Sequence, residues 1–284
     1  MKYAIFTVGL PDLTPEEAVK ELKTAGYDGI EWRITDQSPS KSGTPDYWEG
    51  NLCTWPLKTF VEDAPRIRDL TRGAGLEMPN LGTYVTSAGI ADVETAMKGA
   101  VRTGAKQLRV SIPPFDPATS YAAQLDRALG QYRDVAALAK TSGVRALVEI
   151  HKGNLAPSCS ACAAFVRHFD PAHVGAIHDA GNLVLEGFEH YDIGFGALGP
   201  YLAHVHLKNA LWERAGLRPD GSVAWRGAQA PMDQGQVDIT ELIRSLRKGG
   251  YDGWLSFEDF SAGCDSREKI RKNIAYVKGL EARA

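Results

Sequence analysis

Apolar positions along this chain follow two periods that alternate from one end to the other. Short apolar runs of strand type are followed by longer stretches in which apolar residues recur every three or four positions. In the first unit, a run at 2–10 leads to a helix that Thr14 and Glu17 begin as a capping box and that Gly26 ends. A second run follows at 28–33. Strands that alternate with helices are typical of a parallel sheet with helical crossovers.

The same unit repeats along the chain and predicts eight strands. The segment that starts at Ala25 recurs in similar form at Gly249, where the last helix leads into the last strand. The length of 284 residues is close to the roughly 250 of a typical (β/α)8 barrel. We therefore expect an α/β protein with one domain, 1–284, folded as a single (β/α)8 TIM barrel. The strands are expected at 2–10, 28–33, 78–84, 107–112, 145–150, 174–179, 202–207 and 254–258.

Two connections are longer than the few residues that usually join a barrel strand to its helix. They are 34–56, after strand two, and 209–236, after strand seven. Both leave the barrel at the strand ends where catalytic residues gather. We expect a lid or a substrate wall, with contact between subunits as the alternative. Their aromatic residues include Tyr47, Trp48, Trp55, Trp212 and Trp225.

Composition argues against several classes of protein. With 44% hydrophobic and 24% charged residues, the chain resembles an ordinary globular protein. A net charge of −3 provides no general attraction to nucleic acid. The apolar start 1–10 is short and lacks a cleavage site, and no apolar stretch approaches the ~18 residues that cross a bilayer. We expect a cytoplasmic protein without nucleic-acid or membrane partners; a homo-oligomer stays open.

Cys159 and Cys162 have the C-x-x-C spacing of redox and zinc motifs. No second pair completes a zinc ribbon. We expect both to lie on one face of a helix that opens near Ser158, where they act as small apolar residues.

Four side chains that favour metal ions stand at the ends of predicted strands. Because the carboxyl ends of barrel strands meet at one rim, we expect these side chains to converge and to form a metal site. They are Glu149, Asp179, His206 and Glu258.

Three carboxylates and one imidazole make an oxygen-rich ligand set. Such a set suits one divalent ion, Mn²⁺ by preference and Mg²⁺ or Co²⁺ as alternatives, better than a structural zinc site. Four protein ligands leave two octahedral positions for a hydroxyl and a neighbouring carbonyl of a substrate. Glu149 or Glu258 can then take the proton on carbon, which leaves a metal-bound enediolate, and another acid returns a proton.

The histidines of the seventh strand need a choice. His204, His206 and Lys208 alternate onto the same side of the strand. His206 lies nearer the rim and is the expected ligand, whereas His204 lies deeper and is expected to pack or to support the ligands. His178 precedes Asp179 and faces the opposite way, so we expect it to pack against a helix.

These motifs, taken in order, resemble the xylose-isomerase-like barrel superfamily of sugar isomerases and epimerases over nearly the whole chain. The resemblance implies that the positions of Glu149, Asp179, His206 and Glu258 bind a divalent ion and that the two glutamates exchange protons with the sugar. The motifs are Gly26-Tyr-Asp-Gly-Ile-Glu31, Val148-Glu-Ile-His151, Asp179-Ala-Gly-Asn182, His204-Val-His-Leu-Lys208 and Gly250-Tyr-Asp-Gly-Trp-Leu-Ser-Phe-Glu258.

The chain departs from the ketose 3-epimerases of that superfamily at two positions. Asn182 stands where they usually have a histidine that contacts the substrate, three residues after the metal aspartate. Trp212 stands where an arginine is expected, six residues after the metal histidine. These differences leave the substrate open, as well as the choice between isomerisation and epimerisation.

Strand direction suggests further substrate contacts near the rim. Lys208 and Arg109 can bind a phosphate, a carboxylate or hydroxyls, and the absence of a glycine-rich phosphate loop favours an unphosphorylated or keto-sugar. The alternative for each candidate is a charge pair that supports the metal ligands. The candidates are His151, Asn182, Lys208, Arg109, Arg33 and Glu31.

The leading hypothesis is a metal-dependent isomerase or epimerase of a sugar, cyclitol or related hydroxy-ketone. The same proton abstraction can expel a β-substituent, so a dehydratase or lyase acting on a keto-sugar or keto-inositol is the first alternative. An apurinic endonuclease shares the barrel, but the negative net charge and the few histidines at the rim argue against it. A non-catalytic sugar-binding subunit is the third alternative.

Overall fold

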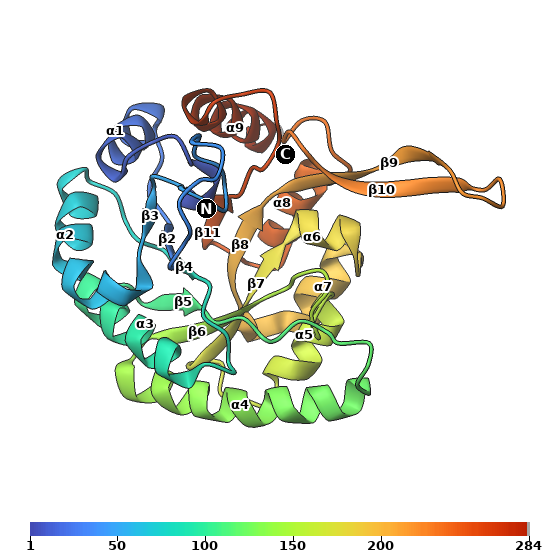
Figure 1. The fold of residues 1–284 in the computed structure, drawn as a ribbon, viewed down its shortest axis with the longest axis horizontal. Helices are drawn as coiled ribbons and strands as arrows, with labels where there is room; N and C mark the ends of the chain where they lie inside the picture. The colour runs from blue at the N-terminus through green and yellow to red at the C-terminus, as the bar shows by residue number, and fades with distance from the viewer. Residues whose placement is uncertain (283–284) are drawn as a thin grey trace.

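The computed structural model describes residues 1–282, and it has the barrel that the sequence predicts (Figure 1). Within these residues, eight parallel strands follow one another around the barrel in chain order. The barrel strands are β1 (Lys2–Ile5), β2 (Trp32–Ile34), β4 (Leu81–Thr83), β5 (Gln107–Arg109), β6 (Arg145–Glu149), β7 (Val174–Asp179), β8 (Leu202–Leu207) and β11 (Trp254–Phe257).

The barrel closes where β1 meets the residues that precede β2. The backbone N–H of Thr7 donates to the Glu31 carbonyl at 2.9 Å, and the N–H of Glu31 donates to the Ile5 carbonyl at 2.8 Å. A short extra strand, β3 (Thr54–Trp55), pairs in parallel with β2 at Arg33 and Ile34. The first strand is shorter than predicted, because the chain turns into the 3-10 helix η1 (Thr7–Gly9) after Phe6.

Helices surround the strands (Figure 1). The first one has the predicted ends, because Thr14 and Glu17 form a capping box and Gly26 takes a left-handed conformation with φ 82°. The helices are α1 (Pro15–Ala25), α2 (Phe60–Gly73), α3 (Ile90–Thr103), α4 (Tyr121–Ser142), α5 (Cys159–Val166), α6 (Ala180–Leu185), α7 (Tyr191–Leu198), α8 (Ile239–Lys248) and α9 (Ser266–Glu281), with the short 3-10 helices η2 (Leu57–Thr59) and η3 (Gly199–Tyr201).

The side chains inside the barrel are polar near the carboxyl ends of the strands, and the apolar ring of Phe6 lies among them. The Phe6 ring lies beside the His206 ring, with centroids 5.7 Å apart. Gly82 on β4 leaves room for Phe6, because a Cβ at this position would overlap the phenylalanine ring. The side chains alternate where the chain enters β2: Glu31, directly before the strand, reaches His206 inside the barrel, whereas the indole of Trp32 donates to Thr71 on α2. This alternation places the inward residues of each strand in layers.

The long segment 209–236, expected from the sequence as a loop after strand seven, contains a β-hairpin. Its strands are β9 (Asn209–Leu217) and β10 (Val223–Ala230), which pair antiparallel from Asn209 and Ala230 at the base. The hairpin extends beyond the ring of helices (Figure 1). Near its base the Trp212 indole N–H donates to the Val184 carbonyl on α6 at 2.9 Å. The outer half of the hairpin is exposed on both faces.

Two smaller expectations concern cysteines and membranes. Cys159 and Cys162 lie in α5 behind the cap residue Ser158, and both are buried free thiols. They are therefore small apolar residues of the core, as predicted. Among the helices of residues 1–282, none has the length and apolar character needed to cross a bilayer.

Candidate metal centre

Four side chains meet at the carboxyl end of the barrel, where the sequence places the metal site. Glu149 ends β6, Asp179 ends β7, His206 lies near the end of β8, and Glu258 directly follows β11. One potential ligand atom from each lies within 4.8 Å of those of the other three. All four residues are buried. The strand register carries this convergence, because Asp179 pairs with His206 across β7 and β8.

Backbone structure orients two of these groups. One oxygen of Asp179 accepts the Asn182 backbone N–H at 2.8 Å and so caps α6, while the other oxygen faces His206. The imidazole of His206 has its Nδ1 atom 3.1 Å from an oxygen of Glu149. The second oxygen of Asp179 and the Nδ1 atom of His206 thus face the same small volume as Glu149.

A second group of polar residues lies one layer deeper in the barrel. Glu31 is fully buried, and its carboxylate accepts hydrogen bonds from Nε2 of His204 at 2.9 Å and Nε2 of His206 at 3.2 Å. The Asn80 amide donates to the same carboxylate at 2.7 Å. A carboxylate that accepts from Nε2 leaves Nδ1 as the atom available to a metal ion. Glu31 therefore supports the candidate ligand His206 from behind.

The charges of this region fit a divalent cation. Four buried carboxylates, Glu31, Glu149, Asp179 and Glu258, face two buried cations, Arg109 and Lys208. Among these six side chains, four negative charges face two positive ones when the histidines are neutral, and one divalent ion, Mn²⁺, Mg²⁺ or Co²⁺, would balance the difference. Burial of charge without compensation is costly, so this deficit favours a bound divalent ion.

Protonation preferences of the group reflect the same excess of negative charge. Burial, together with the neighbouring Glu258 and Glu149, raises the pKa of Asp179 to about 6 against the lowering effect of Lys208. Burial lowers the pKa of His206, but Glu31 and Glu149 outweigh burial and hold this pKa well above its usual value. Without the ion, a proton on His206 therefore supplies part of the missing positive charge.

The two cations are bound to the glutamates of the site. Nη1 of Arg109 donates to Glu149 at 2.6 Å, and its Nε donates to the Thr83 carbonyl at 2.8 Å. Nζ of Lys208 donates to Glu258 at 2.6 Å and lies 3.4 Å from Asp179. Burial would raise the pKa of Glu149, but Arg109 and His206 hold it well below its usual value. Glu149 is therefore a carboxylate that can accept a proton.

Aromatic side chains cover the mouth of the site. Trp48, from the long segment 34–56, stacks on Phe260 with ring centroids 5.3 Å apart and contacts Tyr84 edge-on at 6.5 Å. Tyr47 in the same segment donates to the Ser261 carbonyl at 3.1 Å. The segment 34–56 thus spans the rim from β2 to β11, which is the position expected of a lid or a substrate wall.

The remaining predicted site residues have different surroundings. Asn182 is buried in α6, and its side-chain oxygen lies 3.4 Å from Nζ of Lys208. His151 is only half buried, and its Nδ1 atom lies 2.7 Å from the Lys152 carbonyl. Trp212 belongs to the hairpin base and contacts α6, outside the group of ligands. His178 packs as predicted, with its ring 4.9 Å from that of Phe195 on α7.

Sequence reasoning missed three residues of the site: Asn80, Tyr84 and Phe260. Tyr84 follows β4 directly, and Phe260 lies two positions after Glu258. Both could have been found by extending the search from charged to aromatic residues at strand ends. Asn80 precedes β4, and its contact with Glu31 has no signal in the local sequence.

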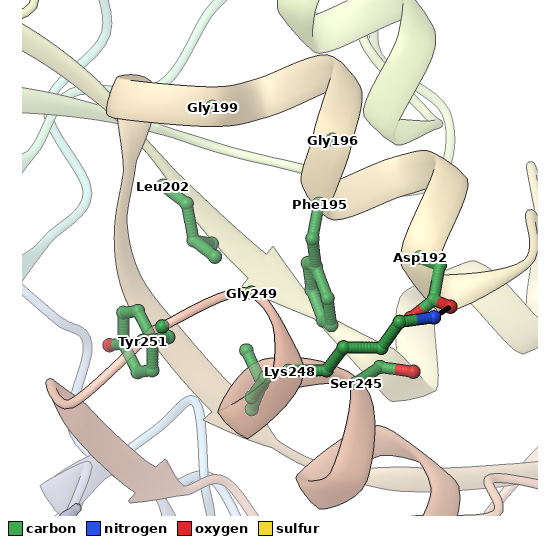
Figure 2. A pocket seen from close by; sticks show the side chains of 11 residues that line it. Asp192, Phe195, Gly196, Gly199, Leu202, Ser245, Lys248, Gly249 and Tyr251 are labelled. Carbon is green, nitrogen blue, oxygen red and sulfur yellow. Dashed lines mark hydrogen bonds and ion pairs between the residues drawn. The ribbon is translucent and has the colours of Figure 1, made fainter.

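A separate cavity of about 480 Å³ lies between α7 and α8 (Figure 2). Its walls include Leu202 at the start of β8 and Tyr251, which precedes β11, so it lies at the opposite end of these strands from Glu258. Its charged residues, Asp192 and Lys248, are 2.5 Å apart and neutralise each other. The amino-terminal ends of barrel strands contribute to stability rather than to chemistry.

Comparison with solved structures finds sugar epimerases with the same fold. The 3-keto-D-glucoside 4-epimerase YcjR from E. coli has a TM-score of 0.72 at 16% identity, and the match covers 98% of this chain and 99% of that one. D-psicose 3-epimerase from Clostridium cellulolyticum H10, solved with D-tagatose, has a TM-score of 0.70 at 13% identity over 99% of both chains. A Mycobacterium smegmatis barrel in complex with magnesium has a TM-score of 0.65 at 19% identity, over 98% and 96%.

The sequence itself establishes the family. The profile described as xylose isomerase-like TIM barrel matches residues 19–280. A search of curated proteins finds no match. The chain therefore belongs to the xylose isomerase-like TIM barrel family, which confirms both the resemblance and the fold class expected from the sequence.

Proposed function

We propose that this member of the xylose isomerase-like TIM barrel family is a divalent-metal-dependent isomerase or epimerase of a sugar or related hydroxy-ketone. The observation that carries the proposal is the buried group of Glu149, Asp179, His206 and Glu258, whose ligand atoms lie within 4.8 Å of one another. The sugar epimerases among the structures with this fold agree with it. Mn²⁺ is the ion that we expect, with Mg²⁺ and Co²⁺ as alternatives, because the donors are mainly oxygen atoms.

Glu149, Asp179, His206 and Glu258 would hold the ion. When bound, such an ion polarises a carbonyl group of the substrate and lowers the pKa of the neighbouring C–H. The protein supplies the proton transfers. Glu149 is the base, because Arg109 at 2.6 Å keeps it ionised while leaving its second oxygen free of this contact. We assign the return of a proton to carbon to Glu258, which Lys208 holds in place by a hydrogen bond of 2.6 Å.

The proton balance distinguishes the possible outcomes. Glu149 removes a proton from the carbon next to the carbonyl, and the electron pair moves onto the carbonyl oxygen. Delivery of a proton to the opposite face of the same carbon gives epimerisation. Delivery to the former carbonyl carbon, with transfer of the neighbouring hydroxyl proton to the former carbonyl oxygen, gives isomerisation. Loss of a β-substituent at this stage would give the lyase that the sequence also allows.

The test is NMR of ketose and keto-sugar substrates in D₂O with the Mn²⁺-loaded protein. We expect deuterium to enter at one carbon with all other atoms retained, and we expect Glu149→Gln and Glu258→Gln to reduce this exchange by about 10²- to 10⁴-fold, the usual share of general acid–base catalysis. Glu17→Gln is the control, because Glu17 caps α1 and is bound to Thr14 and Arg267 rather than to any of the four ligands. Elimination products would replace the proposal with the lyase, and full exchange by Glu149→Gln would refute it.

A further inference from the structure

Arg33 lies at the mouth of the site, on the inward side of the barrel. It lies on β2, two residues after Glu31, which directly precedes this strand in extended backbone, so the two side chains share a face and Arg33 lies one layer nearer the rim. Its exposed fraction is only 3%. Nη1 of Arg33 donates to the side-chain oxygens of Gln37 and Thr54, both at 2.9 Å.

No carboxylate within residues 1–282 forms an ion pair with this buried guanidinium. The Nε atom of Arg33 is buried without a hydrogen-bond partner. The guanidinium lies 5.1 Å from the centre of the Tyr84 ring, and Tyr84, Gln37 and Thr54 are all neutral partners. Asp46 acts on Arg33 electrostatically without an ion pair, and one of its oxygens already accepts two backbone N–H groups, those of Trp48 and Glu49.

The surrounding cations make this position less favourable for an isolated charge. Arg109 lies 4.3 Å from the centre of the same Tyr84 ring, so two guanidinium groups share one aromatic side chain. Arg109 is compensated by Glu149, and Lys208 is compensated by Glu258. Arg33 alone of these three has no anion, and burial of an uncompensated charge is costly.

We propose that Arg33 binds a carboxylate of the substrate, which makes the substrate a hydroxy-keto acid, such as a keto-uronate, rather than a neutral sugar. This inference rests on the proposed function and names the substrate class of the same site. A carboxylate carries the single negative charge that Arg33 lacks, and its two oxygens match the guanidinium fork. A phosphate dianion would require a second free cation, whereas Arg109 and Lys208 are already paired.

The test compares pairs of ligands that differ only in the anionic group. D-fructuronate is compared with D-fructose, and D-tagaturonate with D-tagatose, by calorimetric titration of the Mn²⁺-loaded protein. We expect each acid to bind about 10- to 100-fold more tightly than its neutral partner, as for a hydrogen bond to a charged group. Arg33→Gln should abolish this preference by weakening the binding of the acids far more than that of the neutral sugars, without changing the affinity for Mn²⁺.

Arg66→Gln is the matched control. Arg66 also stacks over an aromatic ring, that of Trp55, but it is exposed and pairs with Glu16 outside the site. This variant should keep the preference for the acids.

Four outcomes would overturn the inference: equal binding of acid and neutral sugar, no binding of either acid, equal weakening of both by Arg33→Gln, or a preference that survives Arg33→Gln and therefore belongs to the ion. The proposed function fails separately. If the acids bind through Arg33 but no deuterium enters them in D₂O, the inference stands and the isomerase proposal falls. If neutral sugars exchange without any preference for acids, the reverse holds.

Discussion

Replacing Glu31 by glutamine tests whether the layer beneath the ligands controls metal binding. We expect Glu31→Gln to weaken Mn²⁺ binding by about 10- to 100-fold, the usual effect of changing a group that orients a metal ligand. This corresponds to roughly 1.4 to 2.8 kcal/mol. Glu31 is not one of the four expected ligands, and both of its oxygens accept hydrogen bonds from other side chains.

The expected magnitude follows from the donors around Glu31. Three N–H groups, from Asn80, His204 and His206, converge on its two oxygens at 2.7, 2.9 and 3.2 Å. A glutamine offers one acceptor oxygen and brings an NH₂ group, so at least one histidine would face a donor. A buried polar group without a partner costs about 1–3 kcal/mol. If His206 avoids this by moving its proton to Nδ1, that proton occupies the position where the ion would bind.

The assay is calorimetric titration of the metal-free variant with Mn²⁺. Glu17→Gln is the matched control, because it makes the same change from carboxylate to amide on α1 and leaves the ligand group untouched. Thermal unfolding of both metal-free proteins separates lost stability from lost affinity. Mn²⁺ affinity in folded Glu31→Gln equal to that of the wild type would show that Glu31 has no part in orienting His206.

Three further predictions concern packing, the ion and the thiols. Gly82→Ala should destabilise the protein by about 1–3 kcal/mol in chemical denaturation, because the new methyl group overlaps Phe6. Gly130→Ala on α4 is the control, because its methyl group enters open space and should stabilise the protein by about 0.5–1 kcal/mol. Equal effects of the two substitutions would contradict this packing. Chelation should lower the melting temperature, and Mn²⁺ at about 100 times its Kd should restore about 2.7 kcal/mol; an unchanged melting temperature would argue against the metal site. Burial raises the pKa of Cys159 to about 12, and Cys264 is the one cysteine among the four that is not buried. The native protein should therefore show one thiol, Cys264, that reacts with Ellman's reagent at pH 8, and four after unfolding. Rapid reaction of more than one native thiol would contradict the burial.

The sequence predicted the barrel and the convergence of four groups because both depend on local patterns. A run of apolar residues that ends in a carboxylate, as at Glu149 and Asp179, shows the strand and the end of the strand together. Parallel strands then bring such ends to one rim. The capping residues of α1 are equally local, so its bounds were predicted as well.

Features that depend on three-dimensional surroundings were missed. The outer halves of the hairpin strands β9 and β10 are exposed on both faces, so neither face has to be apolar. These strands therefore lack the alternation of apolar and polar residues that marks a half-buried strand. Glu31 was expected to contact the substrate. The local sequence around Glu31 could not show that His204 and Asn80, which lie much further along the chain, would form hydrogen bonds with its carboxylate. The alternative considered for it, support of a metal ligand, fits the structure better.

The base of the β9–β10 hairpin has a consequence for how this barrel tolerates change. Asn209 and Ala230 are directly paired, so the excursion leaves and returns to the barrel at almost one point. Closure entropy grows only slowly with the number of residues enclosed. Lengthening, shortening or replacing the outer half of the β9–β10 hairpin should therefore change the stability of the barrel little. The turn between Leu217 and Val223 is a suitable place to insert a foreign sequence or a reporter domain.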